Sequence, residues 1–321
     1  MIRPLLATLR VANAPSVVSN VAVGYLLGRY WWGDAQAVGP VLLWLTLAAL
    51  LLYFAGNLAN DWFDRDWDKV HRPERTLPQG IFRSSVYLES AIVSAVLGVA
   101  FAFVAAGRSG ITALVVVALI ATYTLIHKRS VWGVLPMGGC RAGLYMMGFL
   151  AAWPTDLVEP AHAYGFGPAI YQDIGKGILF ISTHAFGLLA YIAGLSLAAR
   201  CESLPHPPRG TVILSRALLL LPLPALSCWW MPWYALPGSL ALIPFAIWIA
   251  LSLTLLRKPV PRFVSALLAG IPLIDWIAAI PVGAALVLPD GDMPDASWIA
   301  FLLPPLAFLA ALLLQKFSPA T

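Results

Sequence analysis

The chain has 321 residues, of which 60% are hydrophobic and only 11% are charged. Its mean hydropathy of +0.82 excludes a soluble enzyme, because such a composition cannot be divided into a buried core and a solvated surface. The net charge of +5 comes from 20 Lys and Arg residues against 15 Asp and Glu residues. These basic residues stand in short loops between apolar runs, so they indicate membrane topology and not a nucleic-acid partner.

Ten apolar runs are long enough to cross a bilayer, which requires about 20 residues. The runs lie near 11–31, 39–60, 86–106, 111–127, 131–152, 177–199, 211–230, 238–256, 263–288 and 296–315. No small-residue cleavage site ends the first run, so we expect a retained helix and not a signal peptide. Pro304 and Pro305 interrupt the last run. The pattern predicts an all-α, polytopic transmembrane bundle of nine to ten helices.

The distribution of positive charge predicts the orientation of these helices. With a cytoplasmic N-terminus, the inside loops hold sixteen Lys and Arg residues, and the outside segments hold only Arg29, Arg108 and Lys176. Positively charged loops remain in the cytoplasm, so we expect both termini to be cytoplasmic in a protein of the cell (inner) membrane. Tryptophans such as Trp31 and Trp153 stand at the opposite ends of the runs, as interfacial anchors do.

Acidic and amide side chains gather where the second run meets the cytoplasm. At about 100° per residue, four of them fall on one narrow face of a helix that continues to position 68, while Asp66 falls on the opposite side. This set, which we call the acidic stripe, comprises Asn57, Asp61, Asp64 and Asp68, with Asn60 at its border.

Carboxylates stacked at membrane depth repel one another and are costly to desolvate unless a cation lies among them. Oxygen ligands suit Mg²⁺, which also accepts oxygens from a substrate phosphate. The acidic stripe therefore predicts a site for Mg²⁺ and a diphosphate. The alternative is a solvated helix end whose acids pair with Arg65, Lys69 and Arg72.

Basic residues follow in further segments. The prolines and glycine of segment 71–80 require an ordered turn. This turn can return Arg72 and Arg75 to the acidic stripe. Arginine side chains bind diphosphate oxygens bidentately. The fourth run ends at Tyr123 and the pair Lys128-Arg129, which suit a phosphate but also a helix end. Arg141 lies within the fifth run, where a charge must face a cavity or a partner.

The region of the acidic stripe resembles a known family. Segment 60–68, NDWFDRDWD, followed by RPERTLPQG at 72–80, resembles the first aspartate-rich signature of UbiA-type intramembrane prenyltransferases, with Thr76 where the family usually has a second proline. Arg10 and Asn20 in the first run and Tyr123 with Lys128-Arg129 after the fourth agree with it. The resemblance covers residues 10–150 well.

The resemblance implies one transmembrane domain over residues 1–321, with helices around a central cavity. It implies a membrane-embedded prenyltransferase that uses Mg²⁺ and moves an isoprenyl group from an isoprenyl diphosphate to an aromatic or other small-molecule acceptor. The implied metal ligands are Asn57, Asn60, Asp61, Asp64 and Asp68. The implied diphosphate contacts are Arg72, Lys128 and Arg129, which act with the three aspartates. Further residues expected to bind or support the substrates are Asn20, Tyr123, Arg141, Arg200 and Asp275. The oligomeric state is not predicted.

The second half departs from the family pattern. The family usually carries a second motif near DxxDxxxD after the sixth run, but segment 191–202 reads YIAGLSLAARCE and holds no aspartate. Either Arg200 supplies the missing positive charge in a one-metal transferase, or the protein keeps the fold without the diphosphate chemistry. The altered half is similar to that of the EboC-like subgroup. Asp275, an isolated acid in the ninth run, either orients the acceptor or acts as a base, or it is paired with Arg141 or protonated.

The same features also allow three other classes of function to be compared. The main alternative is a UbiA-like protein that binds or transports an isoprenoid or lipid without diphosphate chemistry. A phosphatidyl-type transferase is disfavoured because the sequence lacks a DGxxAR run. A channel is disfavoured because the polar residues cluster at one end of the helices instead of lining a path across the membrane.

Overall fold

A computed structural model describes residues 2–32, 38–153, 174–202, 204, 206–229, 235–256, 258–287 and 297–318. Helices make up the regular structure of these residues, and no strand occurs among them. The N-terminal half contains α1 (Ile2–Thr8), η1 (Val11–Asn13), α2 (Ala14–Trp32), α3 (Val38–His71), α4 (Ser84–Ala105), α5 (Gly107–Ile126), η2 (Val131–Gly133) and α6 (Val134–Ala151). The C-terminal half contains α7 (Ile174–Glu202), α8 (Arg209–Leu220), α9 (Pro222–Ser227), α10 (Ala235–Thr254), α11 (Val260–Ala269), α12 (Ile271–Val287), α13 (Ser297–Phe301) and α14 (Leu303–Leu314).

The predicted all-α, multi-pass membrane fold is confirmed. Eight helical segments of the described residues are long and apolar enough to span a bilayer, with α8–α9 and α11–α12 each forming one such segment. The other two predicted runs are also helical. One is α6, which carries Arg141, and the other is broken into α13 and α14. The break precedes Pro304, as expected of proline, which is tolerated in the first turn of a helix but not in its interior.

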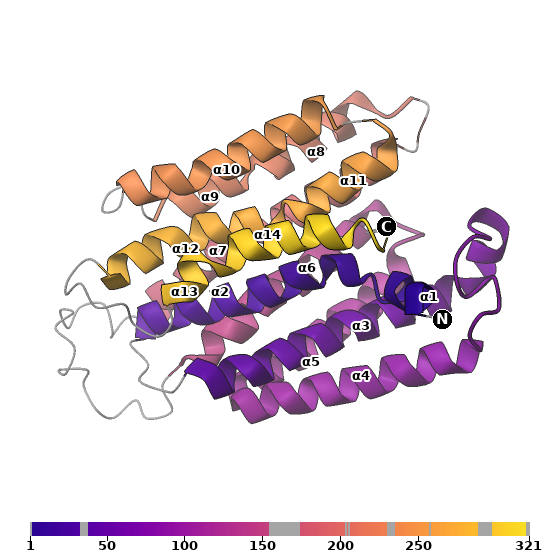
Figure 1. The fold of residues 1–321 in the computed structure, drawn as a ribbon, viewed down its shortest axis with the longest axis horizontal. Coiled ribbons are helices and arrows are strands. Elements are labelled where there is room, and N and C mark those ends of the chain that lie inside the picture. Colours follow the sequence, from indigo (N-terminus) through magenta and orange to yellow (C-terminus); the bar gives the residue numbers. More distant parts are fainter. Residues whose placement is uncertain are drawn as a thin grey trace.

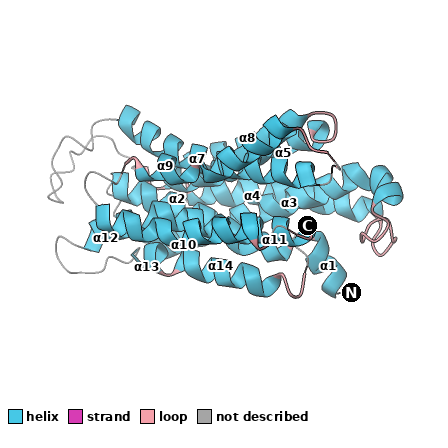
Figure 2. Cartoon of the chain, turned by 90° about the horizontal axis from the view of Figure 1, so that it is seen from above, coloured by secondary structure: helices cyan, strands magenta, loops and turns pink. Residues whose placement is uncertain are grey.

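The helices run roughly side by side, and the chain ends lie at the same end of the bundle (Figure 1). The Ser318 hydroxyl donates to the carbonyl of Leu6 at 3.1 Å, which ties the C-terminal segment to α1. Figure 2 shows the same arrangement from above, with α3 extending past the other helices at that end. The acidic stripe lies in the C-terminal part of α3.

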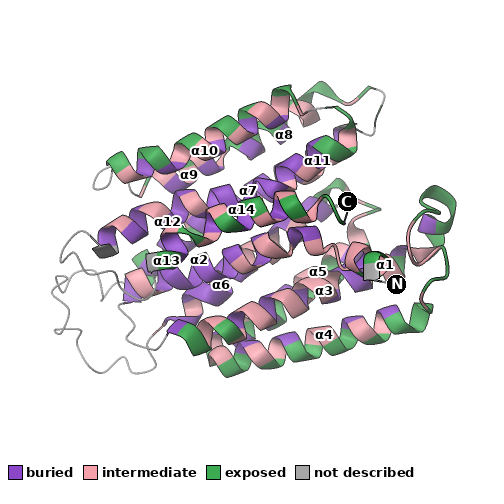
Figure 3. Ribbon diagram, viewed as in Figure 1, coloured by how far each residue is buried: buried purple, intermediate pink, exposed green. Residues whose placement is uncertain are grey.

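Burial separates inner helices from outer ones (Figure 3). Buried residues concentrate on α2, α7 and α12, which lie in the interior of the bundle. The outer helices α4, α8 and α10 expose large apolar side chains such as Val96, Ile213 and Ile247. Helices of a membrane protein expose apolar side chains in this way because lipid surrounds them.

Glycines bring α2 and α6 into close contact. A Cβ at Gly148 of α6 would collide with the carbonyl oxygen of Val21, and a Cβ at Gly24 of α2 would collide with that of Tyr145. Small residues allow transmembrane helices to approach at their backbones, where packing and not the hydrophobic effect holds them together. The α2–α6 contact matters for the site, because both helices contribute polar residues to it.

We expect Gly148→Ala to destabilise the protein by about 1–3 kcal/mol, because the added methyl group forces α2 and α6 apart. Thermal unfolding in detergent measures the effect. Gly107→Ala is the matched control, because a Cβ there meets nothing within 4 Å. Equal melting temperatures for the two variants would contradict the close contact.

Candidate functional site

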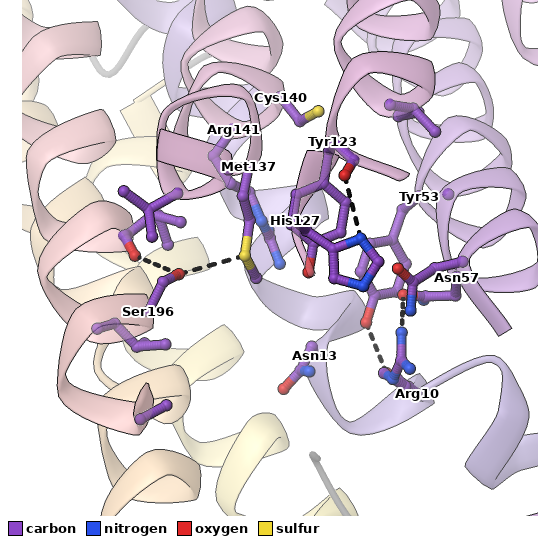
Figure 4. A pocket seen from close by; sticks show the side chains of 18 of the residues that line it. Arg10, Asn13, Tyr53, Asn57, Tyr123, His127, Met137, Cys140, Arg141 and Ser196 are labelled. Carbon is purple, nitrogen blue, oxygen red and sulfur yellow. Dashed lines mark hydrogen bonds between the residues drawn. The ribbon is translucent and has the colours of Figure 1, made fainter. Parts of the chain in front are cut away.

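A cavity of about 830 Å³ lies among α3, α5, α6, α7, α11 and α12. Its interior is lined by apolar side chains, including Leu52, Val116 and Leu144. Polar side chains come mainly from the C-terminal ends of α3, α5 and α7, from the segments that follow α3 and α5, and from Arg10 and Asn13 near the N-terminus, while Arg141 comes from α6. Figure 4 shows side chains from these separate segments converging on the cavity.

The acidic stripe lies on one face of α3, as its spacing predicts. The helix continues without a break to His71. Asp64 and Asp68 are 7% and 2% exposed and line the cavity, whereas the side chain of Asp66, on the opposite face, is 72% exposed. Asn57 and Asn60 are also buried in the cavity wall.

Arg10 binds the inner part of the acidic stripe. Its guanidinium donates to the Asn57 side-chain oxygen at 2.7 Å and to Asp61 Oδ1 at 2.9 Å. Its carbonyl accepts a hydrogen bond from the Tyr53 hydroxyl at 3.0 Å. Its backbone is left-handed, with φ of 48° and ψ of 48°, a conformation that costs free energy in a non-glycine residue and persists where surrounding contacts enforce it. Arg10 and Asp61 therefore form a fixed pair beside the cavity, and Asp61 itself is not part of the lining.

Asp64 is held by two residues that follow α5. Lys128 Nζ lies 2.9 Å from Asp64 Oδ1, and His127 Nε2 lies 3.1 Å from Asp64 Oδ2. The Lys128 ammonium also lies 4.0 Å from the centre of the Trp67 ring, a cation–π distance. His127 stacks on Tyr123, with ring centres 4.8 Å apart. The end of α5 thus brings a basic cluster to α3, as its sequence predicts.

Asp68 is held by the turn that follows α3. Arg75 Nη1 lies 2.8 Å from Asp68 Oδ2 and 3.7 Å from Asp61 Oδ1. Arg72 also lines the cavity. Segment 71–80 thus returns Arg75 to the acidic stripe and places Arg72 in the same cavity wall. Gly80, with φ of 69°, takes a conformation in this turn that favours glycine.

The α7 helix contributes a cation and a hydroxyl to the cavity, where the family pattern would have aspartates. Arg200 and Ser196 line the cavity, and the Arg200 guanidinium donates to the carbonyl of His127. Among the described residues of α7, none that line the cavity is acidic. Among the described side chains of segment 191–202, Arg200 therefore gives this wall of the cavity a positive charge.

A polar network beside the apolar part of the cavity joins α2, α6 and α12. Arg141 Nη1 donates to the Asn20 side-chain oxygen at 3.0 Å, and the Asn20 amide donates to Asp275 at 2.8 and 3.0 Å. The Tyr145 hydroxyl also donates to Asp275, at 2.6 Å. Asn20 and Asp275 are fully buried, and only Arg141 of this network lines the cavity.

The structure separates the predicted site residues into three groups. Those that line the cavity are Asn57, Asn60, Asp64, Asp68, Arg72, Tyr123, Lys128, Arg141 and Arg200. Asp61 and Asn20 are bonded to the lining residues Arg10 and Arg141 from behind, and Asp275 is bonded to Asn20 one step further from the cavity. Arg129 is exposed and is not among the lining residues. Glu202 ends α7, and its side chain lies outside the described part of the chain.

Sequence reasoning gave no role to His127 or Tyr53, although both line the cavity. His127 follows Tyr123 by four residues, so helical spacing alone would have placed it on the same face. Tyr53 precedes Asn57 by four residues on α3 and could have been found in the same way.

The oxygen atoms of the acidic stripe are of the kind that a hard divalent cation such as Mg²⁺ prefers as ligands. In this structure the aspartates of the stripe are paired with the basic side chains of Arg10, Arg75 and Lys128. Within the described ranges, no three acidic, histidine or cysteine side chains are grouped as a metal site. Asn60 Oδ1 and Asp68 Oδ1 are nevertheless buried without a hydrogen-bond partner among those residues. Buried oxygens that lack a donor are suitable ligands for Mg²⁺.

Comparison with known proteins identifies the family. Residues 17–268 match the model of the UbiA prenyltransferase family. The chain belongs to this family. Two solved structures share the UbiA fold with it: a digeranylgeranylglyceryl phosphate synthase, with a TM-score of 0.53 and 17% identity over 98% of both chains, and a UbiA homologue from Aeropyrum pernix, with a TM-score of 0.53 and 15% identity over 94% of this chain and 98% of the other.

Curated relatives of this UbiA-family chain match over shorter segments. The digeranylgeranylglyceryl phosphate synthase of Pyrococcus furiosus is 37% identical over 67 residues, which are 20% of this chain and 24% of that protein. The enzyme of the same name from Methanoregula boonei is 37% identical over 101 residues, or 31% of this chain and 33% of that protein. The matches therefore span a quarter to a third of these relatives.

We expect Arg10→Met to destabilise the protein by about 3 kcal/mol, because it leaves Asp61 buried without its closest cation. Thermal unfolding in detergent measures the change. Lys69→Met is the control, because Lys69 forms an exposed pair with Asp66, and such pairs contribute about 0–1 kcal/mol. A melting temperature for Arg10→Met equal to that of Lys69→Met would contradict the structural role of Arg10.

Proposed function

We propose that this UbiA-family protein is a Mg²⁺-dependent prenyltransferase that transfers an isoprenyl group from an isoprenyl diphosphate to a small-molecule acceptor. One observation carries the proposal: a single cavity joins a wall of buried carboxylate and amide oxygens, faced by basic side chains, to an apolar interior. An isoprenyl diphosphate has the same two parts, a charged head and an apolar chain. The names of the curated relatives, which are synthases, support this class of reaction.

Asn60, Asp64 and Asp68 would hold the metal, because they combine oxygen ligands with positions in the cavity wall. Asn57 and Asp61 would hold Arg10 beside this site. When bound, Mg²⁺ stabilises the negative charge that develops on the leaving diphosphate. Arg72, Arg75 and Lys128 would bind diphosphate oxygens, whereas the exposed Arg129 has no contact that supports such a role.

The reaction breaks the C–O bond of the isoprenyl diphosphate, and the electron pair of that bond leaves with the diphosphate. The prenyl carbon then bonds to the acceptor, whose proton passes to the released diphosphate. Apolar side chains such as Leu52, Val116 and Ile271 would surround the prenyl chain and exclude water from the allylic cation. The basic residues neutralise the leaving group at the other part of the cavity.

Arg200 would take the place of a second metal. It is a basic residue of α7 that lines the cavity, at the place where the family resemblance implies aspartates, and its contact with the His127 carbonyl directs it to the end of α5. A guanidinium at this position can stabilise the leaving diphosphate as a fixed cation. We therefore propose a one-metal transferase.

The orientation belongs to the same proposal. Both termini and the polar part of the cavity would lie on the cytoplasmic side of the cell membrane. The positive loops and the common position of the two chain ends in Figure 1 support this orientation.

Pyrophosphate release tests the proposed function. We expect the purified protein in nanodiscs to release pyrophosphate from geranyl, farnesyl or geranylgeranyl diphosphate only with Mg²⁺, and Asp64→Ala to reduce the rate at least about 100-fold, because the metal and Lys128 both depend on this carboxylate. Asp66→Ala is the matched control, since Asp66 lies on the opposite, exposed face of α3.

A different outcome would favour the alternative function. If no donor yields pyrophosphate and isoprenoids still raise the melting temperature of the protein without Mg²⁺, the protein is an isoprenoid or lipid binder and not a transferase. Asp64→Ala would then leave isoprenoid binding unchanged.

Arg200→Gln tests the one-metal proposal. We expect the rate of pyrophosphate release to fall at least about tenfold, because a charge-assisted hydrogen bond to the leaving group is lost. The Mg²⁺ dependence should be non-cooperative, with a Hill coefficient of about 1 for one site. A cooperative Mg²⁺ dependence together with an unchanged rate in Arg200→Gln would exclude Arg200 as the second cation.

A further inference from the structure

A second cavity, which we call the outer cavity, lies apart from the central one. It has a volume of about 280 Å³ and is bounded by the end of α7, by α8, by the end of α10 and by the start of α11. Among the described residues, the two cavities share no lining residue. The end of α7 separates them, because Arg200 lines the central cavity and the neighbouring Cys201 lines the outer one. The outer cavity therefore lies toward the same end of the bundle as the acidic stripe.

Two basic side chains from separate segments line the outer cavity. Arg216 comes from α8, and Lys258 comes from the segment between α10 and α11. Within the described part of the chain, neither side chain forms a salt bridge or a hydrogen bond, and no acidic side chain lines the outer cavity. The described wall of the outer cavity therefore carries a positive charge that the protein does not compensate.

Arg216 lies within a membrane-spanning segment. It follows the first residue of α8, Arg209, by seven residues, or about 10 Å along the helix axis, and α8–α9 form one span. A cation in a span is costly unless it faces a cavity, a partner or the head-group region. Arg216 faces a cavity whose wall also contains Leu219, Leu253 and Phe263. An anion in the outer cavity would supply the partner that the described residues do not.

Helix dipoles do not decide the charge of the outer cavity. Among the described helices, α8 and α11 begin beside it, and α7 and α10 end beside it. The start of a helix carries roughly half a positive charge and its end roughly half a negative charge. Two starts and two ends cancel approximately, so the side chains of Arg216 and Lys258 give the cavity its sign.

We propose that the outer cavity binds the head group of an anionic phospholipid. The cavity is smaller than sites for drug-sized ligands, which are about 300–1,000 Å³, so it suits a head group and not a whole lipid. The acyl chains can lie on the apolar surface outside, because α8 exposes Ile213 and Leu220, and Leu255 is exposed after α10. Basic pockets between membrane helices on the cytoplasmic side recognise head groups of this kind. The site does not depend on the proposed transfer reaction.

Native mass spectrometry of the purified protein in detergent tests this site. Phosphatidylglycerol, phosphatidylcholine with the same acyl chains, and glycerol 1-phosphate are titrated separately, without Mg²⁺. We expect one phosphatidylglycerol molecule to bind at least about tenfold more tightly than phosphatidylcholine, because the choline cation repels the two basic side chains. It should also bind at least about tenfold more tightly than glycerol 1-phosphate, which lacks the acyl chains and their apolar contacts.

Paired variants locate the bound lipid. Arg216→Gln combined with Lys258→Gln should remove the preference for phosphatidylglycerol over phosphatidylcholine. Arg83→Gln combined with Lys316→Gln is the matched control, because it removes the same charge from exposed residues that do not line the outer cavity, and it should keep the preference. If the first pair does not fold, Arg216→Gln alone should reduce the preference at least about threefold, because one of the two cations is lost.

Three results would overturn the lipid site. One is an equal affinity of the wild-type protein for the two phospholipids, or a preference that persists when Arg216 and Lys258 are both replaced. Another is an equal affinity for phosphatidylglycerol and glycerol 1-phosphate, which would indicate an anion from the aqueous phase. The third is loss of the preference in Arg72→Gln combined with Lys128→Gln, which would place the lipid in the central cavity. None of these readouts requires pyrophosphate release, so the proposed transferase is tested separately.

Discussion

The structure depends on the cost of placing three carboxylates on one face of a membrane-spanning helix. Burial removes Asp61, Asp64 and Asp68 from water, and the penalty for each ion is several kcal/mol unless a cation lies beside it. The chain supplies these cations from three segments: Arg10 before α2, the turn after α3, and the end of α5. One electrostatic requirement therefore links segments that are distant in sequence and assembles the polar end of the cavity.

The ion pairs between the acidic stripe and these basic side chains also explain how the site can be stable without a ligand and still bind a diphosphate. The basic side chains that neutralise the acidic stripe end in groups that also suit a phosphate, as with Lys128, whose ammonium also lies on the Trp67 ring. Under the proposed function, Asn60, Asp64 and Asp68 would hold the divalent cation, and the basic side chains would bind the diphosphate. Each carboxylate would then retain a positive partner, so no unpaired charge would remain in a region of low dielectric.

The sequence predicted the helices and the acidic stripe because both depend on local periodicity. Hydrophobic runs of fixed length and residues repeating on one helix face are visible without tertiary contacts. The Asn20–Asp275 contact was not predicted, because its partners are separated by 255 positions, and Asp275 was considered only with Arg141. Arg129 shows a limit of the resemblance: it is adjacent to Lys128 in sequence, yet α5 ends there, and only Lys128 reaches the cavity.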